Sequence, residues 1–139
     1  MQRRRFIKSL ALGTVAGVAI PGVTLAAPPS PAGGVYYTRQ NPGRWKGKEA
    51  GHLPRMEVLG SVGGTRIRVT TPHPMDGYRH YIVKHVVLDG KYRFLAEHLF
   101  DPEKDSVPVS EFDLGTYRGQ IYLLSLCNLH DLWLATYRV

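Results

Sequence analysis

Residues Tyr78–Phe100 decide the fold, and they read YRHYIVKHVVLDGKYRFLAEHLF. The first half, Tyr78–Leu88, is rich in β-branched and aromatic residues, which pack well on the face of a sheet. Asp89-Gly90 is a strong signal for a tight turn, and apolar residues return in the second half, Lys91–Phe100. This stretch therefore predicts a β-hairpin.

Shorter runs of the same kind lie on both sides of this hairpin. They span residues 56–60, 65–71, 117–126 and 132–139. The first two flank Gly63-Gly64, a second hairpin signal, and Asp101–Val107 is expected to form a charged loop. No stretch keeps a helical period for three turns. About seven short strands are typical of an immunoglobulin-like domain. We therefore predict an all-β fold, an immunoglobulin-like β-sandwich over residues 56–139.

The composition allows one domain and excludes several classes of protein. The chain has 139 residues, 43% of them apolar and 21% charged, which is too apolar for a disordered polyelectrolyte. A single cysteine excludes an intramolecular disulfide framework. The net charge is +7, but four positive charges precede residue 28, and without them it falls to +3. That mild charge does not predict a nucleic-acid partner, which needs a concentrated basic face.

The first 27 residues have the pattern of an export signal. A basic start is followed by a weakly apolar run, Leu10–Leu25, which Pro21 interrupts and which is too short for a stable membrane span. Arg3-Arg4-Arg5-Phe6-Ile7-Lys8 resembles the twin-arginine (Tat) signal, with Gln2 in place of the usual Ser or Thr. We predict a periplasmic protein exported by the Tat route; an ordinary Sec signal or an uncleaved anchor is the alternative. Because Tat passengers cross the membrane folded, the resemblance also suggests a metalloprotein.

Residues 28–55 form a second segment, rich in Pro, Gly and Lys, which predicts an extended arm and loop. Its aromatic residues Tyr36, Tyr37 and Trp45 are expected to pack the arm onto the sandwich or onto a neighbouring subunit.

Candidate metal ligands lie near the ends of the predicted strands. The Cys and His of Cys127-Asn128-Leu129-His130 are three residues apart after an apolar strand, so both can reach one metal from a tight turn. His73-Pro74-Met75 precedes the long strand, which we expect to begin near His80, and His52-Leu53-Pro54 precedes the first strand. Each piece alone is also compatible with an ordinary loop or strand histidine. Together they place four His and one Cys where a sandwich can gather them at one rim.

These same motifs resemble the iron domain of the superoxide reductases, the neelaredoxin and desulfoferrodoxin group. The likeness covers residues 49–135 and includes His80-Tyr81-Ile82 and Cys127–Trp133, in matching order and approximate spacing. The resemblance implies a mononuclear non-haem iron held by four His nitrogens and one axial Cys sulfur. Carried over to this chain, the ligands are His52, His73, His80, His130 and Cys127. It further implies the one-electron reduction of superoxide to hydrogen peroxide at a sixth, open position.

The chain departs from the family pattern before its first ligand. Family members commonly carry Glu-Lys directly before the first His, where the Glu can cap the sixth position and the Lys attracts superoxide. Ala50-Gly51 stand there in this chain, and Lys48-Glu49 lie two residues earlier. Lys48 and Glu49 are therefore candidate catalytic residues if flexible Gly51 lets them reach the iron; otherwise both are solvated surface charges.

Two further departures fall within the ligand loops. The interval from His73 to His80 is one residue longer than usual, and Asp76-Gly77 can absorb the extra residue as a turn. His85 is a distant substitute for His80. Asp131 stands where the family usually has Gly, and Asp tolerates left-handed backbone better than most residues.

Two histidines and two aromatic residues are assigned structural roles. His85 and His98 fall within predicted strands, so we expect both to be structural. Trp133 and Tyr81 are expected in the core or around the metal.

Other functions compete with superoxide reduction. The displaced Glu-Lys pair favours, as an alternative, an iron-binding redox or electron-transfer protein without efficient superoxide reduction. A blue-copper carrier also uses His and Cys on a sandwich, but no Met follows His130 at the usual distance. A metal-free binding domain would leave five donors unexplained. The expected partners are superoxide, an unidentified electron donor and a second copy of the chain in a homo-oligomer.

Overall fold

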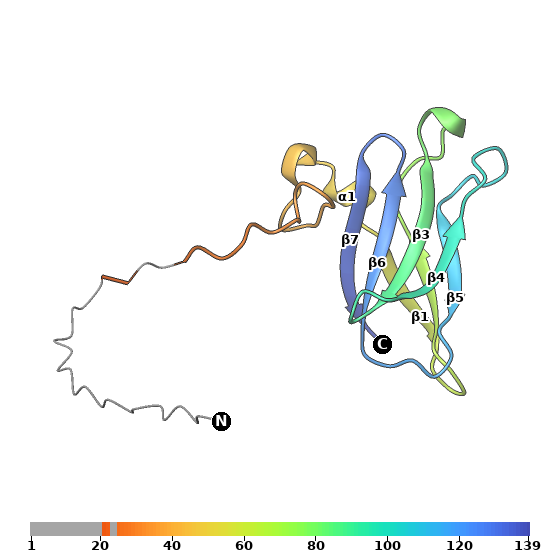
Figure 1. The fold of residues 1–139 in the computed structure, drawn as a ribbon. Helices are drawn as coiled ribbons and strands as arrows, with labels where there is room; N and C mark the ends of the chain where they lie inside the picture. The colour runs from red at the N-terminus through yellow and green to blue at the C-terminus, as the bar shows by residue number, and fades with distance from the viewer. Residues whose placement is uncertain (1–20, 23–24) are drawn as a thin grey trace, which may run out of the picture.

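The computed structural model describes residues 21–22 and 25–139 (Figure 1). Most of the export signal predicted at residues 1–27 lies outside these residues. Among the residues that are described, no helix is long and apolar enough to span a membrane.

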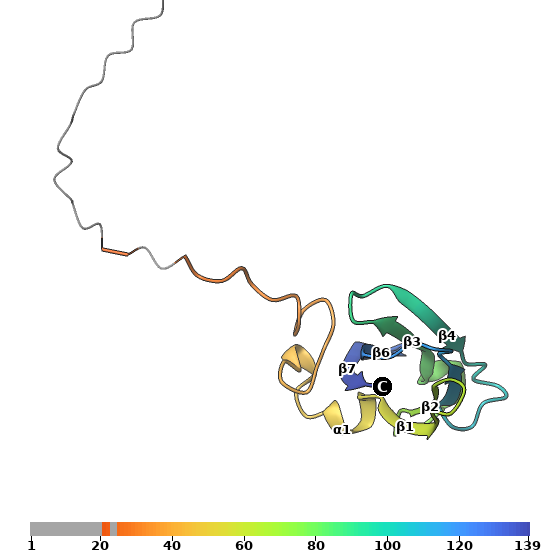
Figure 2. The ribbon, with the colours of Figure 1, turned by 90° about the horizontal axis from the view of Figure 1, so that it is seen from below.

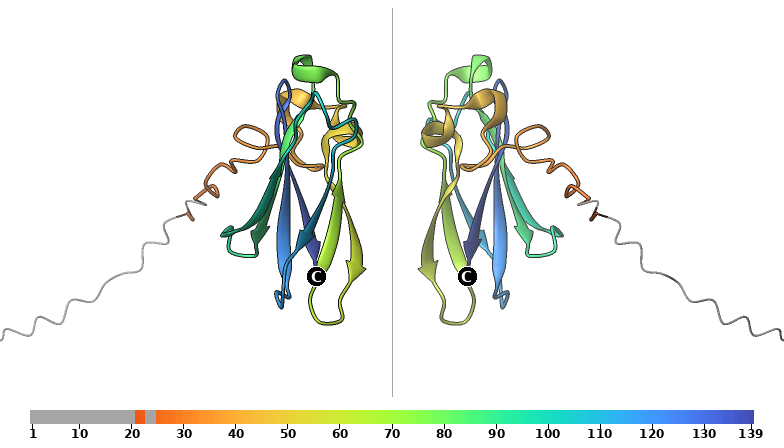
Figure 3. Two further views of the ribbon diagram at one scale, coloured as in Figure 1. Left: turned by 90° about the vertical axis from the view of Figure 1, so that its right-hand side faces the viewer. Right: turned by 90° about the vertical axis from the view of Figure 1, so that its left-hand side faces the viewer.

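In the described part of the chain, seven strands form two antiparallel sheets that face each other (Figures 2 and 3), so the prediction of an all-β sandwich is confirmed. The strands are β1 Arg55–Gly60, β2 Arg66–Thr70, β3 Ile82–Asp89, β4 Phe94–Leu99, β5 Val109–Asp113, β6 Gln120–Cys127 and β7 Asp131–Arg138. One sheet has the order β1-β2-β5 and the other the order β4-β3-β6-β7. Both predicted hairpins are present, as β1–β2 and β3–β4.

Two details differ from the sequence prediction. Strand β5 was not expected, because its residue Ser110 faces inward and interrupts the apolar alternation that marks a strand. The long strand begins at Ile82 rather than near His80, because Gly77–Arg79 forms a 3-10 turn, η2, before it. Gly77 has a φ of 52°, which glycine adopts without strain.

The core lies between the sheets, where every second residue of the facing strands points inward. Its central cluster consists of Ile67, Val69, Val87, Phe112, Ile121 and Leu123. Burying a side chain of this size contributes about 1.5–3 kcal/mol each. This cluster holds the two sheets in register and leaves the ligand-bearing loops at one end of the sandwich.

The segment before β1 packs on the sandwich and is more ordered than an extended arm. It contains a 3-10 turn, η1 (Gly43–Trp45), and a single helical turn, α1 (Glu49–His52), neither of which was predicted. The Tyr37 N–H donates to the Leu132 carbonyl at 2.8 Å, which adds the arm to the edge of β7. Tyr37, Leu53 and Trp133 form a buried cluster against which Trp45 packs. The expectation that the arm's aromatic residues pack onto the sandwich is confirmed for Tyr37 and Trp45.

Candidate metal centre

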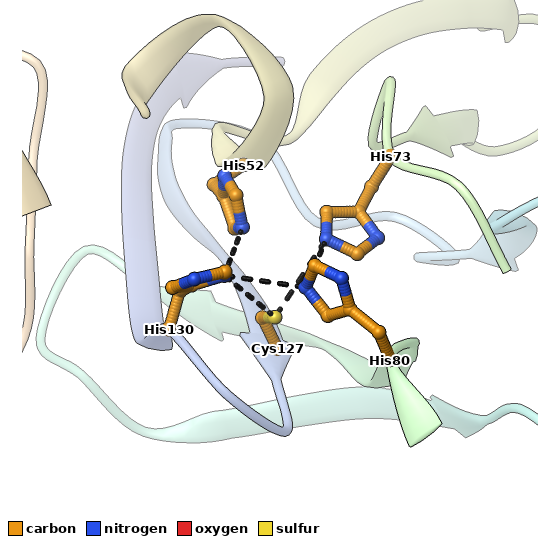
Figure 4. A group of neighbouring side chains, drawn as sticks. All are labelled: His52, His73, His80, Cys127 and His130. Carbon is orange, nitrogen blue, oxygen red and sulfur yellow. Dashed lines mark hydrogen bonds between the residues drawn. The ribbon is translucent and has the colours of Figure 1, made fainter. Parts of the chain in front are cut away.

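Five donors from separate segments converge at one end of the sandwich (Figure 4). They are His52 at the end of α1, His73 in the loop after β2, His80 directly after η2, Cys127 at the end of β6 and His130 in the β6–β7 turn. We call them the His/Cys cluster. Their ligand atoms all lie within 4.8 Å of one another. The structure therefore brings together all five residues that the resemblance selected.

Backbone carbonyls set the orientation of two of the rings. The His52 Nδ1–H donates to the Lys48 carbonyl at 2.8 Å, and the His73 Nδ1–H donates to the Pro74 carbonyl at 2.6 Å. A neutral imidazole has one N–H, so in both rings the Nε2 atom is left with a free lone pair. Both Nε2 atoms point into the cluster, which is the arrangement that outer hydrogen bonds give to metal-binding histidines.

The ring nitrogens are spaced as the ligands of one metal ion would be. His52 Nε2 lies 3.1 Å from His130 Nδ1, which lies 3.2 Å from His80 Nε2. His80 Nε2 in turn lies 3.0 Å from His73 Nε2. Imidazole nitrogens bound about 2.1 Å from a metal, at right angles to each other, are about 3.0 Å apart. Neutral rings could form N–H···N hydrogen bonds at no more than two of these three contacts, whereas one cation at the centre can accept a lone pair from all four nitrogens, so the cluster fits a bound metal.

Cys127 supplies the soft donor on the inner side of the cluster. Its Sγ lies 3.6 Å from His130 Nδ1 and 3.7 Å from His73 Nε2, and the residue is 1% exposed, whereas His80 and His130 are half-buried. Burial raises the pKa of the Cys127 thiol, while the N–H groups of Leu129 and His130 act in the opposite direction. A metal would displace the thiol proton on binding.

Burial favours the neutral imidazole in three histidines of the cluster, His52, His73 and His130. Burial lowers the pKa of His52 to about 4, and burial likewise lowers the pKa of His73. The pKa of His130 is lowered by burial first and by the positive charge of Lys48 second. Neutral imidazoles are the form that binds a metal.

Asn128 joins the two loops that carry His80 and Cys127. Its Oδ1 accepts from the Tyr81 N–H at 3.0 Å, and its Nδ2 donates to the carbonyls of Tyr78 and Arg79 at 3.3 and 3.2 Å. The Asn128 N–H also donates to the Tyr81 carbonyl. In the sequence this Asn stands out only as part of the Cys127–His130 motif, although a side chain with both a donor and an acceptor in a ligand turn is a signal for such a clamp.

Residues around His130 hold the β6–β7 turn in place. Trp133 is fully buried, which confirms its predicted place in the core, and its Nε1–H donates to the His130 carbonyl at 2.8 Å. The Trp45 ring meets the His130 ring edge-on at 4.8 Å between centroids. Asp131 has a φ of 63°, so it adopts the left-handed backbone that was expected of it.

Asp131 also has a role that the sequence did not reveal. Its Oδ2 accepts from the Trp45 Nε1–H at 2.7 Å and from the Arg44 guanidinium at 2.6 Å. The Trp45 hydrogen bond, and then Arg44, hold the pKa of the Asp131 carboxyl below its usual range. This carboxylate ties η1 to the ligand turn.

Lys48 and Glu49 have different positions relative to the cluster. Lys48 is exposed, and its positive charge acts to lower the pKa of His130 and Cys127. The Glu49 carboxylate accepts from the Gly47 N–H at 2.8 Å, at the start of α1. In the described part of the chain it does not belong to the His/Cys cluster. To reach the metal as predicted, the Glu49 carboxylate would have to break its hydrogen bond with the Gly47 N–H.

The two histidines assigned structural roles lie outside the cluster. His85 is completely buried between the sheets, where Thr71 and Ser110 bond both of its ring nitrogens. His98 is exposed on β4, next to His85 in the strand register.

A β-sandwich carrying four imidazoles and one thiol at its rim defines a class of metalloprotein. Structural zinc is almost always four-coordinate, and blue-copper sites use two His and one Cys, so a set of four His and one Cys departs from both. Imidazoles with a thiolate suit a mononuclear non-haem iron site.

Comparison with known proteins gives the family. Residues 44–136 match the desulfoferrodoxin family model, and the chain belongs to that family. No curated protein sequence matches the chain at a significant level.

Solved structures show the same fold. A single-residue variant of superoxide reductase (neelaredoxin) from Ignicoccus hospitalis is 27% identical, with a TM-score of 0.63 over 76% of this chain and 93% of that one. A superoxide reductase in the oxidized state is 23% identical, with a TM-score of 0.58 over 76% and 96%. Superoxide reductase from Nanoarchaeum equitans is 17% identical, with a TM-score of 0.57 over 66% and 94%. The last two show the fold alone.

Proposed function

We propose that this protein is an exported non-haem iron oxidoreductase that reduces superoxide by one electron to hydrogen peroxide. The observation that carries the proposal is the convergence of four imidazole nitrogens and one thiol, with the sulfur on the buried side. The family, and the superoxide reductases of the same fold, support it.

The five donors would hold the iron, which supplies the electron when bound. His52, His73, His80 and His130 would bind it through the nitrogens that face one another, and Cys127 from the inner side. A thiolate at that place donates electron density. The reaction consumes one superoxide, one electron and two protons for each hydrogen peroxide, and a one-electron donor must restore the iron.

Lys48 would bring the anion to the cluster. Its charge already acts on His130, and the side chain is exposed, so it can attract superoxide electrostatically before contact. Glu49 is proposed as a residue that reaches the metal only when it releases the Gly47 N–H.

The place of action is proposed from the sequence. We propose that residues 1–27 direct the folded protein to the periplasm by the Tat route, on the strength of Arg3-Arg4-Arg5-Phe6-Ile7-Lys8. Fusing residues 1–27 to a reporter, with Arg3–Arg5 changed to Lys in a control, tests the proposal: export that persists in the control excludes this route.

Pulsed superoxide tests the activity. The iron-loaded protein is expected to form one hydrogen peroxide for each superoxide consumed, with loss of the ferrous spectrum. His130→Ala should lose iron and activity, whereas His98→Gln, which alters an exposed histidine outside the cluster, should keep both. A protein that binds no iron, or binds it without forming peroxide, contradicts the proposal.

A redox or electron-transfer role is the second candidate, and one observation favours it. Glu49 bonds the start of α1, so the displaced Glu-Lys pair does not reproduce the family arrangement. An intact iron spectrum with a slow reaction toward superoxide would favour this role.

A further inference from the structure

A chain of four polar side chains is buried in the sandwich directly beneath the His/Cys cluster. His85 Nδ1 lies 2.7 Å from Ser110 Oγ, and His85 Nε2 lies 2.8 Å from Thr71 Oγ1. Thr71 Oγ1 lies 2.8 Å from Ser125 Oγ. We call these four residues the buried polar chain. Thr71, His85 and Ser125 are all 0% exposed, and Ser110 is 4% exposed.

The buried polar chain links both sheets. Ser110 lies on β5 and Thr71 directly follows β2, in one sheet, while His85 on β3 and Ser125 on β6 are register partners in the other. A neutral His85 ring can take part in both of its hydrogen bonds, since it donates from one ring nitrogen and accepts at the other, so no charge has to be buried. Because leaving a buried polar group unpaired is destabilising, the buried polar chain holds these strands at one spacing.

Two members of the buried polar chain lie two residues before ligands of the cluster. Ser125 precedes Cys127 on β6, and the two-residue period of a strand places both side chains on the same inner face. Thr71 precedes His73, and the Thr71 carbonyl accepts from the His73 N–H at 2.8 Å. Each ligand is thus attached to a member of the chain through a short piece of backbone, which is extended between Ser125 and Cys127 and is a γ-turn between Thr71 and His73.

The hydrogen bond between Thr71 and Ser125 therefore spans the same gap as the contact between His73 and Cys127. That contact, Nε2 to Sγ, is 3.7 Å long, and it joins a loop of one sheet to a strand of the other. Apolar contacts alone tolerate sliding between sheets, whereas a hydrogen bond prescribes a distance and a direction.

We propose that the buried polar chain positions the Cys127 sulfur: its hydrogen bonds set the distance between Cys127 and His73, and thereby the place from which the thiolate would bind a metal. Its members are positioning residues, because none of them belongs to the cluster. The proposal rests on the proposed function only in taking the cluster as a metal site.

The test removes single hydroxyls with little change in the size of the side chain, because Thr→Val replaces the hydroxyl by a methyl group and Ser→Ala deletes one oxygen atom. Thr71→Val and Ser125→Ala each break the hydrogen bond between the sheets. Thr65→Val is the matched control, since Thr65 is 2% exposed at the other end of β2 and contacts the Tyr117 carbonyl and Arg118. It removes a buried hydroxyl far from the cluster and reports the effect of lost stability alone.

Two measurements decide between positioning and a general loss of stability. In metal-free protein, a thiol reagent should modify Cys127 about tenfold faster in Thr71→Val and Ser125→Ala than in Thr65→Val. In iron-loaded protein, the sulfur-to-iron charge-transfer band should shift, and iron affinity should fall by about 10- to 100-fold, in the first two variants only.

The outcomes separate this inference from the proposed function. Equal thiol reactivity, band energy and iron affinity in all three variants would overturn the positioning role, whatever the activity. Wild-type protein that binds iron without reducing superoxide would overturn the proposed activity and leave the comparison of the variants intact. If Thr71→Val does not fold, Ser125→Ala supplies both measurements.

Discussion

The carboxylate of Asp131 offers a sharp test of how the ligand turn is stabilised. It combines a left-handed backbone, with a φ of 63°, and a 2.7 Å hydrogen bond from the Trp45 Nε1–H. A hydrogen bond to a charged group contributes about 1.5–3 kcal/mol, and the lower end applies here because the side chain is 40% exposed. A left-handed backbone costs an ordinary L residue about 1–2 kcal/mol, and Asp and Asn somewhat less.

The hydrogen bond and the backbone strain together predict the order in which three substitutions lower the free energy of unfolding. Asp131→Asn keeps an acceptor and the backbone tolerance, so it should cost about 0.5 kcal/mol. Asp131→Gly loses the bond but relieves the backbone, partly offset by a more flexible unfolded chain, for a cost of about 1–1.5 kcal/mol. Asp131→Ala loses the hydrogen bond and also increases the backbone strain, because Ala tolerates a left-handed backbone less well than Asp. It should therefore cost about 2 kcal/mol or slightly more.

Urea unfolding of the metal-free protein measures the ranking without the contribution of metal binding. If the free energy of unfolding falls by about 2 kcal/mol per molar urea, Asp131→Ala should lower the urea midpoint of unfolding by about 1 M. Arg44→Ala is the control, since Arg44 is exposed and solvent screens its pairing, so its midpoint should stay close to wild type. Asp131→Gly less stable than Asp131→Ala would refute the backbone argument, and an unchanged midpoint in Asp131→Ala would refute the hydrogen-bond argument.

Three further predictions concern the site and its surroundings. Cys127→Ser should abolish the sulfur-to-iron charge-transfer absorption, while its circular dichroism stays that of the wild type. Absorption that persists in Cys127→Ser, or that is also lost in the control His98→Gln, would contradict the assignment of Cys127 as the sulfur ligand. Burial lowers the pKa of His85 to about 3, so below pH 6.5 only the unfolded state takes up its proton. The free energy of unfolding should therefore fall, by up to about 1.4 kcal/mol per pH unit, between pH 6.5 and 3, and the fall should be shallower in His85→Gln; urea titrations at several pH values with equal slopes for both proteins would contradict this. Lys48→Ala should slow the reaction with superoxide several-fold and weaken its dependence on salt, unlike Lys46→Ala, and stopped-flow rates at two ionic strengths that do not differ between the two variants would exclude a steering role.

The positions of six of the seven strands in the described residues could be predicted from local chemistry, and each error has a physical cause. The hairpin around Asp89-Gly90 is present because its turn and its β-branched flanks agree. Strand β5 escaped prediction because Ser110 faces inward, and a polar residue is buried there only because His85 lies opposite to bond it. One-turn helices such as α1 are too short to leave a period in the sequence.

The ligand set could be proposed from motifs, but motifs do not fix which nitrogen faces the metal. That depends on the carbonyls of Lys48 and Pro74, which orient His52 and His73 once the loops are folded. Likewise, Glu49 was a candidate by its place in the chain, whereas its bond to the Gly47 N–H is a consequence of α1.

The amino-acid sequence alone determined the class of fold, the donor types and the turn chemistry, because strand propensity, turn residues and ligand identity are properties of short segments. Only the tertiary structure decided how these segments meet: the spacing of His73 and Cys127, the clamp by Asn128 and the bonds of Asp131 to Trp45. Those contacts join residues far apart in the chain, and their distances are set by the packing of one sheet against the other.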